Sequence, residues 1–246
     1  EADHVAGYRS LVQVNTYSTS QVLKLVATTK PKALCYFGST NMWINTAGEK
    51  NVKVIREDFD LSTLASGLLG GYRQSKWVSE RLVEHARARG VPVLVVRPGT
   101  LGGIAGMGDE LNRETYQLGR SKDSFINRII AGCEQFGYAP ISQANFSETP
   151  ISWFGDMFGR LLTKPAAWSG KYPAFHIKNP HALTDMNSSR VETTFKWIPM
   201  DEWATSFKAY ANTEEGSTNP LTPLVGYIDL LVSLPDFDMQ FTRSVL

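Results

Sequence analysis

Two short apolar runs, each followed by a turn of Pro or Gly, place the strongest constraint on the fold of this 246-residue chain. They read "KALCYFGS" (residues 32–39) and "VPVLVVRPG" (residues 91–99). Both runs are too short for helices, and the Pro and Gly residues around them favour strands. Because neither run alternates apolar with polar residues, both are typical of parallel strands that are buried on both faces.

Segments with helical spacing precede and separate these runs. The first covers residues 8–29, and its predicted buried stripe comprises Leu11, Val14, Val22, Leu23, Leu25 and Val26. The second covers residues 71–90, with Gly90 at the position of a C-terminal cap. Its predicted apolar side comprises Trp77, Val78, Leu82, Val83 and Ala86. The order helix, strand, helix, strand predicts an α/β fold in which helices cover a parallel sheet.

This alternation ends near residue 103. "DSFINRIIAGCEQFG" and "ISWFGDMFGRLL" predict helices, "YPAFHIKNP" predicts one short strand, and "NTEEGSTNP" (212–220) reads as a linker. We therefore predict a sheet domain over 1–103 and a smaller, mostly helical portion over 104–246, whose elements can interleave. The second portion should pack at the carboxyl edge of the sheet, where open α/β sheets bind ligands.

Composition excludes several classes of protein. Lys and Arg number 25 and Asp and Glu 24, so the net charge of +1 creates no global attraction to nucleic acid or to an anionic membrane. Cys35 and Cys133 lie in apolar surroundings, as buried free thiols of a reducing compartment do. No apolar run approaches the roughly 18 residues of a membrane span, and the first residues lack the pattern of a signal peptide. We expect a soluble, cytoplasmic protein.

Tyr72 and Lys76 are the first candidates for catalysis. On a helix, residues four apart share a face, so a phenol and an ammonium can point into one cleft. A nearby cation lowers the pKa of a phenol, which is ordinarily near 10. Such a tyrosine can donate a proton to a carbonyl oxygen as hydride reaches the carbon. With 9 tyrosines in the chain, an ordinary solvated helix face would also produce this spacing.

The ends of both predicted strands add to this pair. The first strand ends in Gly38-Ser39-Thr40, and the second ends in "VVRPGTLGG". This combination resembles the extended short-chain dehydrogenase/reductase superfamily, in which a Ser or Thr, a Tyr and a Lys act together. In that superfamily the Pro-Gly after the following strand lies beside the nicotinamide. The resemblance implies a Rossmann-like fold and a hydride-transfer enzyme.

Further motifs, which together run over nearly the whole chain, narrow the resemblance to thioester reductase domains. They are "YRSLVQVN", the Trp after Lys76 in "GYRQSKWVSERL", "DSFINRIIAGCEQFGYAP", "TPISWFGDMFGRLL", "FHIKNPHALT", "FKWIPMDEW" and "LPDFDMQFTRSVL". Such domains occur at the C-terminus of nonribosomal peptide synthetases, α-aminoadipate reductases, carboxylic acid reductases and some polyketide synthases. The resemblance implies that NADPH reduces an acyl thioester on the phosphopantetheine of a carrier protein. The acyl group then leaves as an aldehyde, or after further reduction as an alcohol.

The resemblance also implies roles for individual residues. Thr40 and Tyr72 would hold the thioester oxygen, with Tyr72 as the proton donor, and Ser39 would replace Thr40 if the strand register is shifted by one. Lys76 would lower the pKa of Tyr72 and bind the nicotinamide ribose. The helices after residue 123 would shape the acyl and pantetheine channel. The implied cofactor-binding set is Ser39, Tyr72, Lys76, Arg97, Pro98, Gly99 and Thr100.

One part of a dinucleotide-binding domain is not found in this sequence. A Rossmann domain holds the pyrophosphate on a Gly-x-Gly-x-x-Gly turn after its first strand. "GGIAGMG" (102–108) follows a late strand and lacks that spacing, so we interpret it as a loop at the edge of the active site. We expect a partial Rossmann-like sheet whose N-terminal strands, at least two βαβ units or on the order of 60 to 90 residues, are missing. We therefore expect that this chain alone does not bind the cofactor as a complete domain would.

Other functions remain as alternatives. The chain could be another extended short-chain reductase or epimerase with a soluble substrate such as a nucleotide sugar, or a non-catalytic, truncated reductase-like protein. A hydrolytic thioesterase of the α/β-hydrolase type is disfavoured, because no Gly-x-Ser-x-Gly motif occurs. His176 and His181 are five residues apart around a Pro, a poor spacing for a shared metal, so we predict no metal site.

Overall fold

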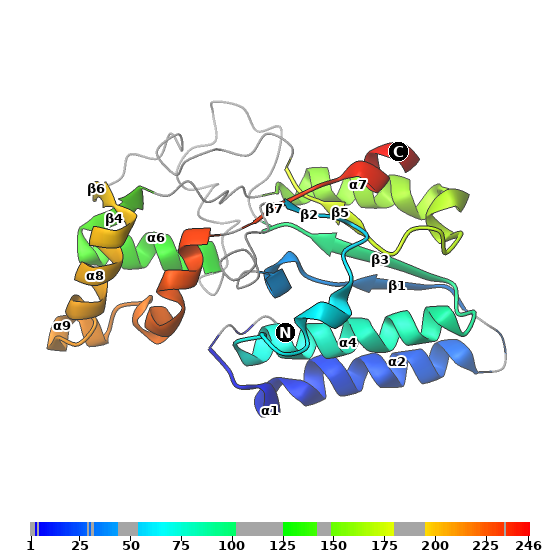
Figure 1. Cartoon of the computed structure of the whole chain (residues 1–246), viewed down its shortest axis with the longest axis horizontal. Coiled ribbons are helices and arrows are strands. Elements are labelled where there is room, and N and C mark those ends of the chain that lie inside the picture. Colours follow the sequence, from blue (N-terminus) through cyan, green and yellow to red (C-terminus); the bar gives the residue numbers. More distant parts are fainter. Residues whose placement is uncertain are drawn as a thin grey trace.

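The computed structural model describes residues 3, 5–28, 30, 32–43, 54–101, 125–141, 149–179, 195–233 and 235–246. Its main sheet has three parallel strands in the order β1 (Leu34–Phe37), β3 (Val93–Pro98) and β5 (Phe175–Ile177). β1 and β3 are the two strands predicted from the apolar runs, and β5 lies within the predicted run "YPAFHIKNP". Helices cover both faces of this sheet (Figure 1), so the predicted α/β class is confirmed.

The side chains of β3 alternate between two apolar layers. Val93 and Val95 pack with Val83 on one side of the sheet. Leu94 and Val96 pack on the other side, against α7 (Ile151–Thr163). β1 is less buried than predicted, and Phe37 is 40% exposed, because β1 is the edge strand of the sheet among the described residues.

The first predicted helix is interrupted. α1 (Tyr8–Leu11) continues into a π-helical segment, η1 (Val12–Tyr17), and then into α2 (Ser18–Ala27). A π-helical turn contains more residues than an α-helical turn, so the apolar stripe changes face at this point. Leu11 and Val26 are buried as predicted, whereas the prediction was wrong for three members of the stripe, which are exposed: Val14, Val22 and Leu25.

The second predicted helix is confirmed as α4 (Gly71–Ala88), and Gly90 has the positive φ of 91° that favours glycine after a helix. The predicted apolar side was only partly correct, because small polar residues occupy much of the buried face. Ser75 and Ser79 are both 0% exposed. The Ser75 hydroxyl accepts a hydrogen bond from the side-chain amide of Asn15 (2.9 Å), and the Ser79 hydroxyl donates to the Asn15 carbonyl (2.9 Å). α4 is thus held to η1 by polar contacts rather than by an apolar stripe.

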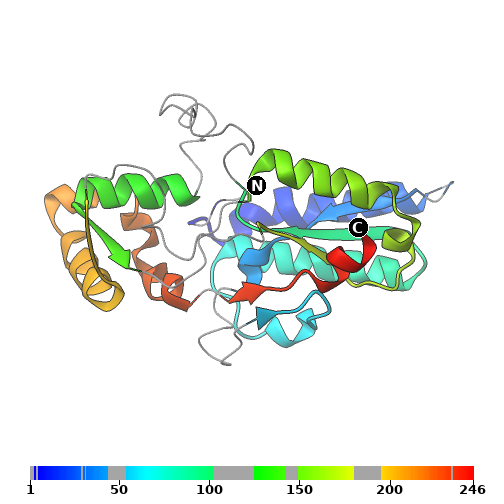
Figure 2. The ribbon, with the colours of Figure 1, turned by 90° about the horizontal axis from the view of Figure 1, so that it is seen from above.

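A second lobe lies beyond the carboxyl ends of β1 and β3 (Figures 1 and 2). Its core includes Cys133, Trp203 and Phe207. Its elements are α6 (Phe125–Phe136), β4 (Tyr138–Ile141), β6 (Lys196–Pro199), α8 (Met200–Tyr210), α9 (Glu214–Ser217) and η6 (Thr222–Ser233). The parallel pair β4 and β6 was not predicted. The predicted linker was also wrong, since Thr213 caps α9 and Asn219 is 2% exposed.

The remaining elements connect the end of the chain to the main sheet. β2 (Val54–Ile55) pairs in parallel with β7 (Asp236–Phe237), and α10 (Gln240–Val245) follows β7. Three short 3-10 helices complete the list: η2 (Thr40–Trp43), η3 (Leu61–Leu64) and η4 (Pro165–Trp168). The domain boundary at residue 103 stays a prediction, and elements from the two ranges interleave, because α7, β5 and α10 accompany the main sheet.

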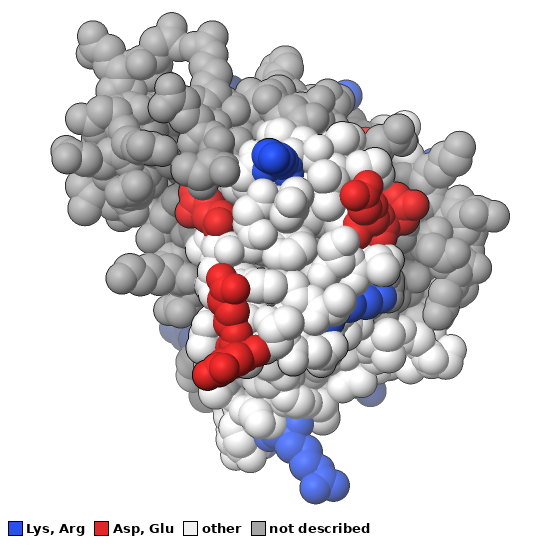
Figure 3. Space-filling view, turned by 90° about the vertical axis from the view of Figure 1, so that its left-hand side faces the viewer, with Lys and Arg blue, Asp and Glu red and all other residues white. Residues whose placement is uncertain are grey.

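Among the described residues, charged side chains do not gather by sign at the end of the molecule formed by the second lobe. Figure 3 views this end, where acidic and basic side chains stand as separate groups among uncharged residues. None of the helices in the described part of the chain has the length and apolar character needed to cross a bilayer.

Two glycines provide a matched test of the packing around α4. A Cβ at Gly71 would clash with the backbone of residues 6–8, whereas a Cβ at Gly155 in α7 would meet nothing within 4 Å. We expect Gly71→Ala to lower the free energy of unfolding by about 1–3 kcal/mol through overpacking. Gly155→Ala should raise it by about 0.5–1 kcal/mol, because alanine is the better helix former. Urea unfolding measures both, and equal effects of the two changes would contradict the close approach at Gly71.

Candidate active site

The predicted hydroxyl and phenol groups meet where β1 ends and α4 begins. The Tyr72 hydroxyl donates to the Ser39 hydroxyl at 3.5 Å, the upper limit for such a bond, and the two residues are 8% and 6% exposed. The Thr40 hydroxyl donates instead to the Pro98 carbonyl at 3.0 Å. Of the two hydroxyl residues named from the sequence, Ser39 is thus the recorded partner of Tyr72, and Thr40 ties the end of β1 to the end of β3.

Lys76 lies one helical turn beyond Tyr72 and reaches the same strand end. Its Nζ donates to the Phe37 carbonyl at 3.0 Å and stands 5.5 Å from the centre of the Tyr36 ring. Burial lowers the pKa of Lys76, and the nearby carboxylate of Glu80 acts in the opposite direction. The ammonium is therefore held at the end of β1 by a backbone carbonyl and an aromatic face.

The pKa of Tyr72 departs from the expectation. A neighbouring ammonium was expected to lower it, but burial raises the pKa of Tyr72, and its hydrogen bond with Ser39 offsets only part of that increase. The Lys76 nitrogen donates to the Phe37 carbonyl, so the cation is partly engaged elsewhere. Tyr72 is accordingly a protonated phenol at neutral pH, which is the state that a proton donor requires.

The turn after β3 is held by its own backbone. The Gly99 N–H donates to the Ile177 carbonyl at 2.9 Å, and the Thr100 carbonyl accepts from the Thr149 N–H at 2.6 Å. A Cβ at Gly99 would lie 2.9 Å from Thr149 Oγ1 and 3.0 Å from Lys178 Cβ. Only glycine fits this turn without displacing a neighbour. The Gly99 N–H and the Thr100 carbonyl already form these hydrogen bonds within the protein. A ligand beside the turn would therefore contact it mainly through van der Waals packing.

Thr149 and Lys178 contribute to this region and were not identified from the sequence. Thr149 is 0% exposed, and its hydroxyl accepts from the Asn179 N–H at 2.9 Å, so it joins the segments on either side of the turn. Lys178 forms an ion pair with Asp236, the first residue of β7. The only local signal for Thr149 was its place directly before Pro150, the N-cap residue of α7.

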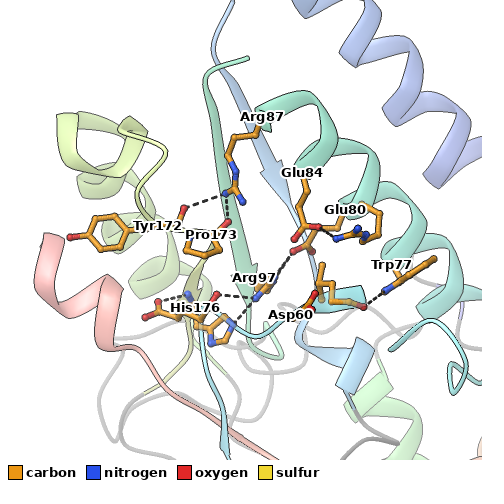
Figure 4. A network of polar contacts seen from close by, with 12 residues as sticks. Asp60, Trp77, Glu80, Glu84, Arg87, Arg97, Tyr172, Pro173 and His176 are labelled. Carbon is orange, nitrogen blue, oxygen red and sulfur yellow. Dashed lines mark hydrogen bonds and ion pairs between the residues drawn. The ribbon is translucent and has the colours of Figure 1, made fainter. Parts of the chain in front are cut away.

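Arg97 does not lie as expected for a cofactor-binding residue. Its side chain is 1% exposed, and its Nε and Nη2 atoms each lie 2.7 Å from Glu80 Oε1 (Figure 4). Its Nη1 donates to the Glu57 carbonyl and faces His176 Nε2, each at 3.4 Å. These groups enclose the guanidinium inside the protein, and the predicted role of Arg97 in cofactor binding stays a prediction. Pairing explains why a charged side chain is buried on a central strand.

His176, one of the two histidines weighed for a metal, belongs to this buried network. Its Nδ1 lies 2.9 Å from the Asp238 carbonyl, and burial with the nearby Arg97 lowers the pKa of His176 to about 3. Its backbone N–H donates to Glu57 at 2.8 Å, and Glu57 also accepts from the hydroxyl of Thr242 at 2.6 Å. The neutral His176 thus helps to join β5 to the end of the chain. His181 and the loop 102–108 lie outside the described residues.

The two cysteines have no catalytic environment. Both are free thiols; Cys133 is buried as predicted, whereas Cys35 on the edge strand is only half-buried. Burial raises the pKa of Cys133 to about 12 and that of Cys35 to about 11. A thiol with so high a pKa is a poor nucleophile at neutral pH.

The described residues fit the reacting end of a nicotinamide cofactor but not its pyrophosphate end. A buried phenol, a hydroxyl and an ammonium converge at the carboxyl end of a parallel sheet, beside a glycine turn that admits no side chain. This is the edge at which open α/β sheets bind nucleotides. A glycine turn with the Gly-x-Gly-x-x-Gly spacing is not present in the sequence.

Comparisons with known proteins agree with this arrangement. The model of an NAD-binding family described as "Male sterility protein" matches residues 1–153. The large subunit of L-2-aminoadipate reductase from Eremothecium gossypii is 28% identical over 97% of this chain, which spans 17% of that protein. Nonribosomal peptide synthetase asaC from Aspergillus flavus is 28% identical over 91% of this chain, which spans 21% of that protein.

A solved structure supports the fold. The terminal R domain from the myxalamid PKS-NRPS biosynthetic pathway has a TM-score of 0.75 and 24% identity; it covers all of this chain, which spans 60% of that domain. The chain is therefore clearly shorter than the relatives that it matches. The similarity to these relatives shows that the chain is homologous to the reductase domains of nonribosomal peptide synthetases and aminoadipate reductases. The match over residues 1–153 shows that it belongs to the NAD-binding family described as "Male sterility protein".

Proposed function

We propose that this chain carries the catalytic residues of an NADPH-dependent thioester reductase. The observation that supports it most directly is the buried Tyr72 phenol, which contacts the Ser39 hydroxyl at the carboxyl end of β1, with Lys76 on the same face of α4. Homology to reductase domains supports reduction rather than hydrolysis. The preference for NADPH comes from the resemblance to thioester reductases.

In the proposed reaction the thioester oxygen lies at the hydroxyl groups of Tyr72 and Ser39. Bound NADPH supplies a hydride to the thioester carbon. Tyr72 donates its proton to the oxygen, which neutralises the charge that develops there. The carbon–sulfur bond of the resulting hemithioacetal then breaks while its hydroxyl proton passes to the sulfur, so that an aldehyde and a free thiol are released. Lys76 stabilises the phenolate that remains, because an ammonium nearby favours the charged form of a phenol.

The partner in this proposal is an acyl- or peptidyl-carrier protein whose phosphopantetheine arm delivers the thioester. Supporting it, this chain is similar to peptide synthetases and aminoadipate reductases, which are much longer multidomain proteins. The second lobe lies at the carboxyl end of the sheet (Figure 2). In this position it can form one wall of a channel for the acyl group and the phosphopantetheine arm.

Cofactor binding is tested first. NADPH is titrated calorimetrically into the 246-residue chain and, separately, into the longest protein that the same reading frame encodes. Catalysis is tested in whichever chain binds, with an acyl-pantetheine thioester as substrate. We expect NADPH oxidation together with release of one thiol per aldehyde. Turnover of a nucleotide sugar but not of the thioester would favour the soluble-substrate reductase or epimerase, and absence of NADPH binding in both chains would favour the non-catalytic alternative.

A further inference from the structure

Glu80 is a buried carboxylate that the proposed mechanism does not yet use. It lies on α4 one helical turn after Lys76 and is 0% exposed. Its Oε1 receives both contacts from Arg97, and its Oε2 has no hydrogen-bond partner among the described residues. Burying an ion pair costs solvation free energy, and apolar residues of equal volume often stabilise a fold as well or better. Stability alone is therefore a weak explanation for this pair.

The carboxylate of Glu80 packs directly against Gly38. A Cβ at Gly38 would clash with Glu80 Oε2 and would lie 3.0 Å from Arg97 Cγ. Gly38 connects Phe37, whose carbonyl accepts from Lys76, to Ser39, whose hydroxyl accepts from Tyr72. The side chain of Glu80 thus occupies the space beside the short backbone segment on which both catalytic contacts depend.

The other partner of Glu80 comes from the neighbouring strand. Arg97 immediately precedes Pro98, whose carbonyl accepts from Thr40, and the turn at Gly99 follows. One carboxylate therefore lies against the end of β1 at Gly38 and pairs with Arg97 near the end of β3; Figure 4 shows the pair. A small displacement of either strand end would move the hydroxyl groups relative to the bound substrate.

We propose that Glu80 is a positioning residue for the reductase reaction: its charge, held by Arg97 and packed on Gly38, fixes the ammonium of Lys76 at the Phe37 carbonyl, one helical turn from Tyr72. This inference rests on the proposed function. Glu80 contacts neither substrate nor cofactor in this proposal and acts through Lys76 and the end of β1.

The charge of Glu80 has a measurable consequence at Lys76. Among the described residues, the ionisable groups around Lys76 are Tyr36 on β1, Tyr72 and Glu80 on α4 and, through Glu80, Arg97 on β3. Burial raises the pKa of both tyrosines, so they are neutral. Burial lowers the pKa of Lys76, and the negative charge of Glu80 opposes this effect by raising it.

The test is Glu80→Gln, which keeps the size of the side chain and removes its charge. At pH 7 we expect kcat for the pantetheine thioester to fall about tenfold with KM nearly unchanged, because only the reacting geometry is disturbed. The pKa of Lys76 should fall, so the alkaline limb of the kcat profile should move down by about one pH unit. Glu84→Gln is the matched control, since Glu84 is one turn further along α4 and pairs with Arg81 near the surface; its profile should match the wild type.

A readout without turnover separates this inference from the proposed function. NMR titration of ¹³Cε-labelled lysine, with Lys76→Arg to assign the signal, should show a lower pKa for Lys76 in Glu80→Gln. If the wild type reduces no thioester, the proposed function fails. The titration still shows whether the charge of Glu80 raises the pKa of Lys76. If Glu80→Gln does not fold, the double variant Glu80→Gln/Arg97→Met removes both buried charges and should show the same lowered pKa. The proposal would be overturned if the pKa of Lys76 were unchanged in Glu80→Gln, or if the alkaline limb of its kcat profile stayed at the same pH as in the wild type.

Discussion

Tyr72→Phe is expected to reduce hydride transfer to the thioester by about 10²–10⁴-fold, the range that a positioned proton donor contributes. The substitution removes one hydroxyl and leaves the ring, which is 8% exposed and packed at the start of α4. Affinity for NADPH should therefore change little. The measurement is single-turnover NADPH oxidation with an acyl-pantetheine thioester, alongside calorimetric titration of the cofactor.

A matched control exists in the second lobe. Tyr210 in α8 is half-buried, and its hydroxyl has no hydrogen-bond partner among the described residues. Tyr210→Phe therefore removes the same group at a position outside the proposed site and should leave turnover at the wild-type level. Full activity in Tyr72→Phe would refute Tyr72 as the proton donor. Equal loss in both variants would point to a general effect on folding.

The main sheet and the Tyr72 and Lys76 pair were predictable, because both are encoded locally. The strands are short apolar runs between Pro and Gly residues, and a spacing of four on a helix places two side chains on one face. The choice between Ser39 and Thr40 was not predictable. Adjacent residues after a strand point in different directions, and the onset of η2 at Thr40 decides which hydroxyl turns toward Tyr72.

The errors have physical causes of their own. Residues 12–17 form a π-helix, which has more residues per turn than an α-helix. A search for the 3.6-residue period does not detect this change, so the buried stripe was misplaced. Arg97 and Glu80 are 17 residues apart, and their pairing depends on the packing of α4 against β3. The resemblance implied that Arg97 binds the cofactor, and it gave no indication that the Arg97 side chain pairs with Glu80 inside the protein.

Arg97→Met is expected to lower the free energy of unfolding by about 3–5 kcal/mol, the cost of leaving a buried charge without its partner. Glu80 has 0% exposure and loses both contacts of its Oε1. The loss should depend on pH. Burial raises the pKa of Glu80 and Arg97 opposes that rise, so the loss of Arg97 favours the protonated form of Glu80 in the folded variant. Its destabilising effect is small at low pH and grows as pH rises through that pKa.

Two further variants separate charge from packing in urea unfolding at pH 5 and pH 8. Arg97→Met/Glu80→Leu removes both charges and should recover most of the loss, because apolar residues of similar volume can replace a buried pair. Arg160→Met breaks an exposed pair with Asp156 and should change stability by less than about 1 kcal/mol. If Arg97→Met were no worse than Arg160→Met at pH 8, the pair would not be a buried ionic contact. Recovery of stability without recovery of kcat in the double variant would then separate the two roles of Glu80, because packing is restored and the charge behind Lys76 is not.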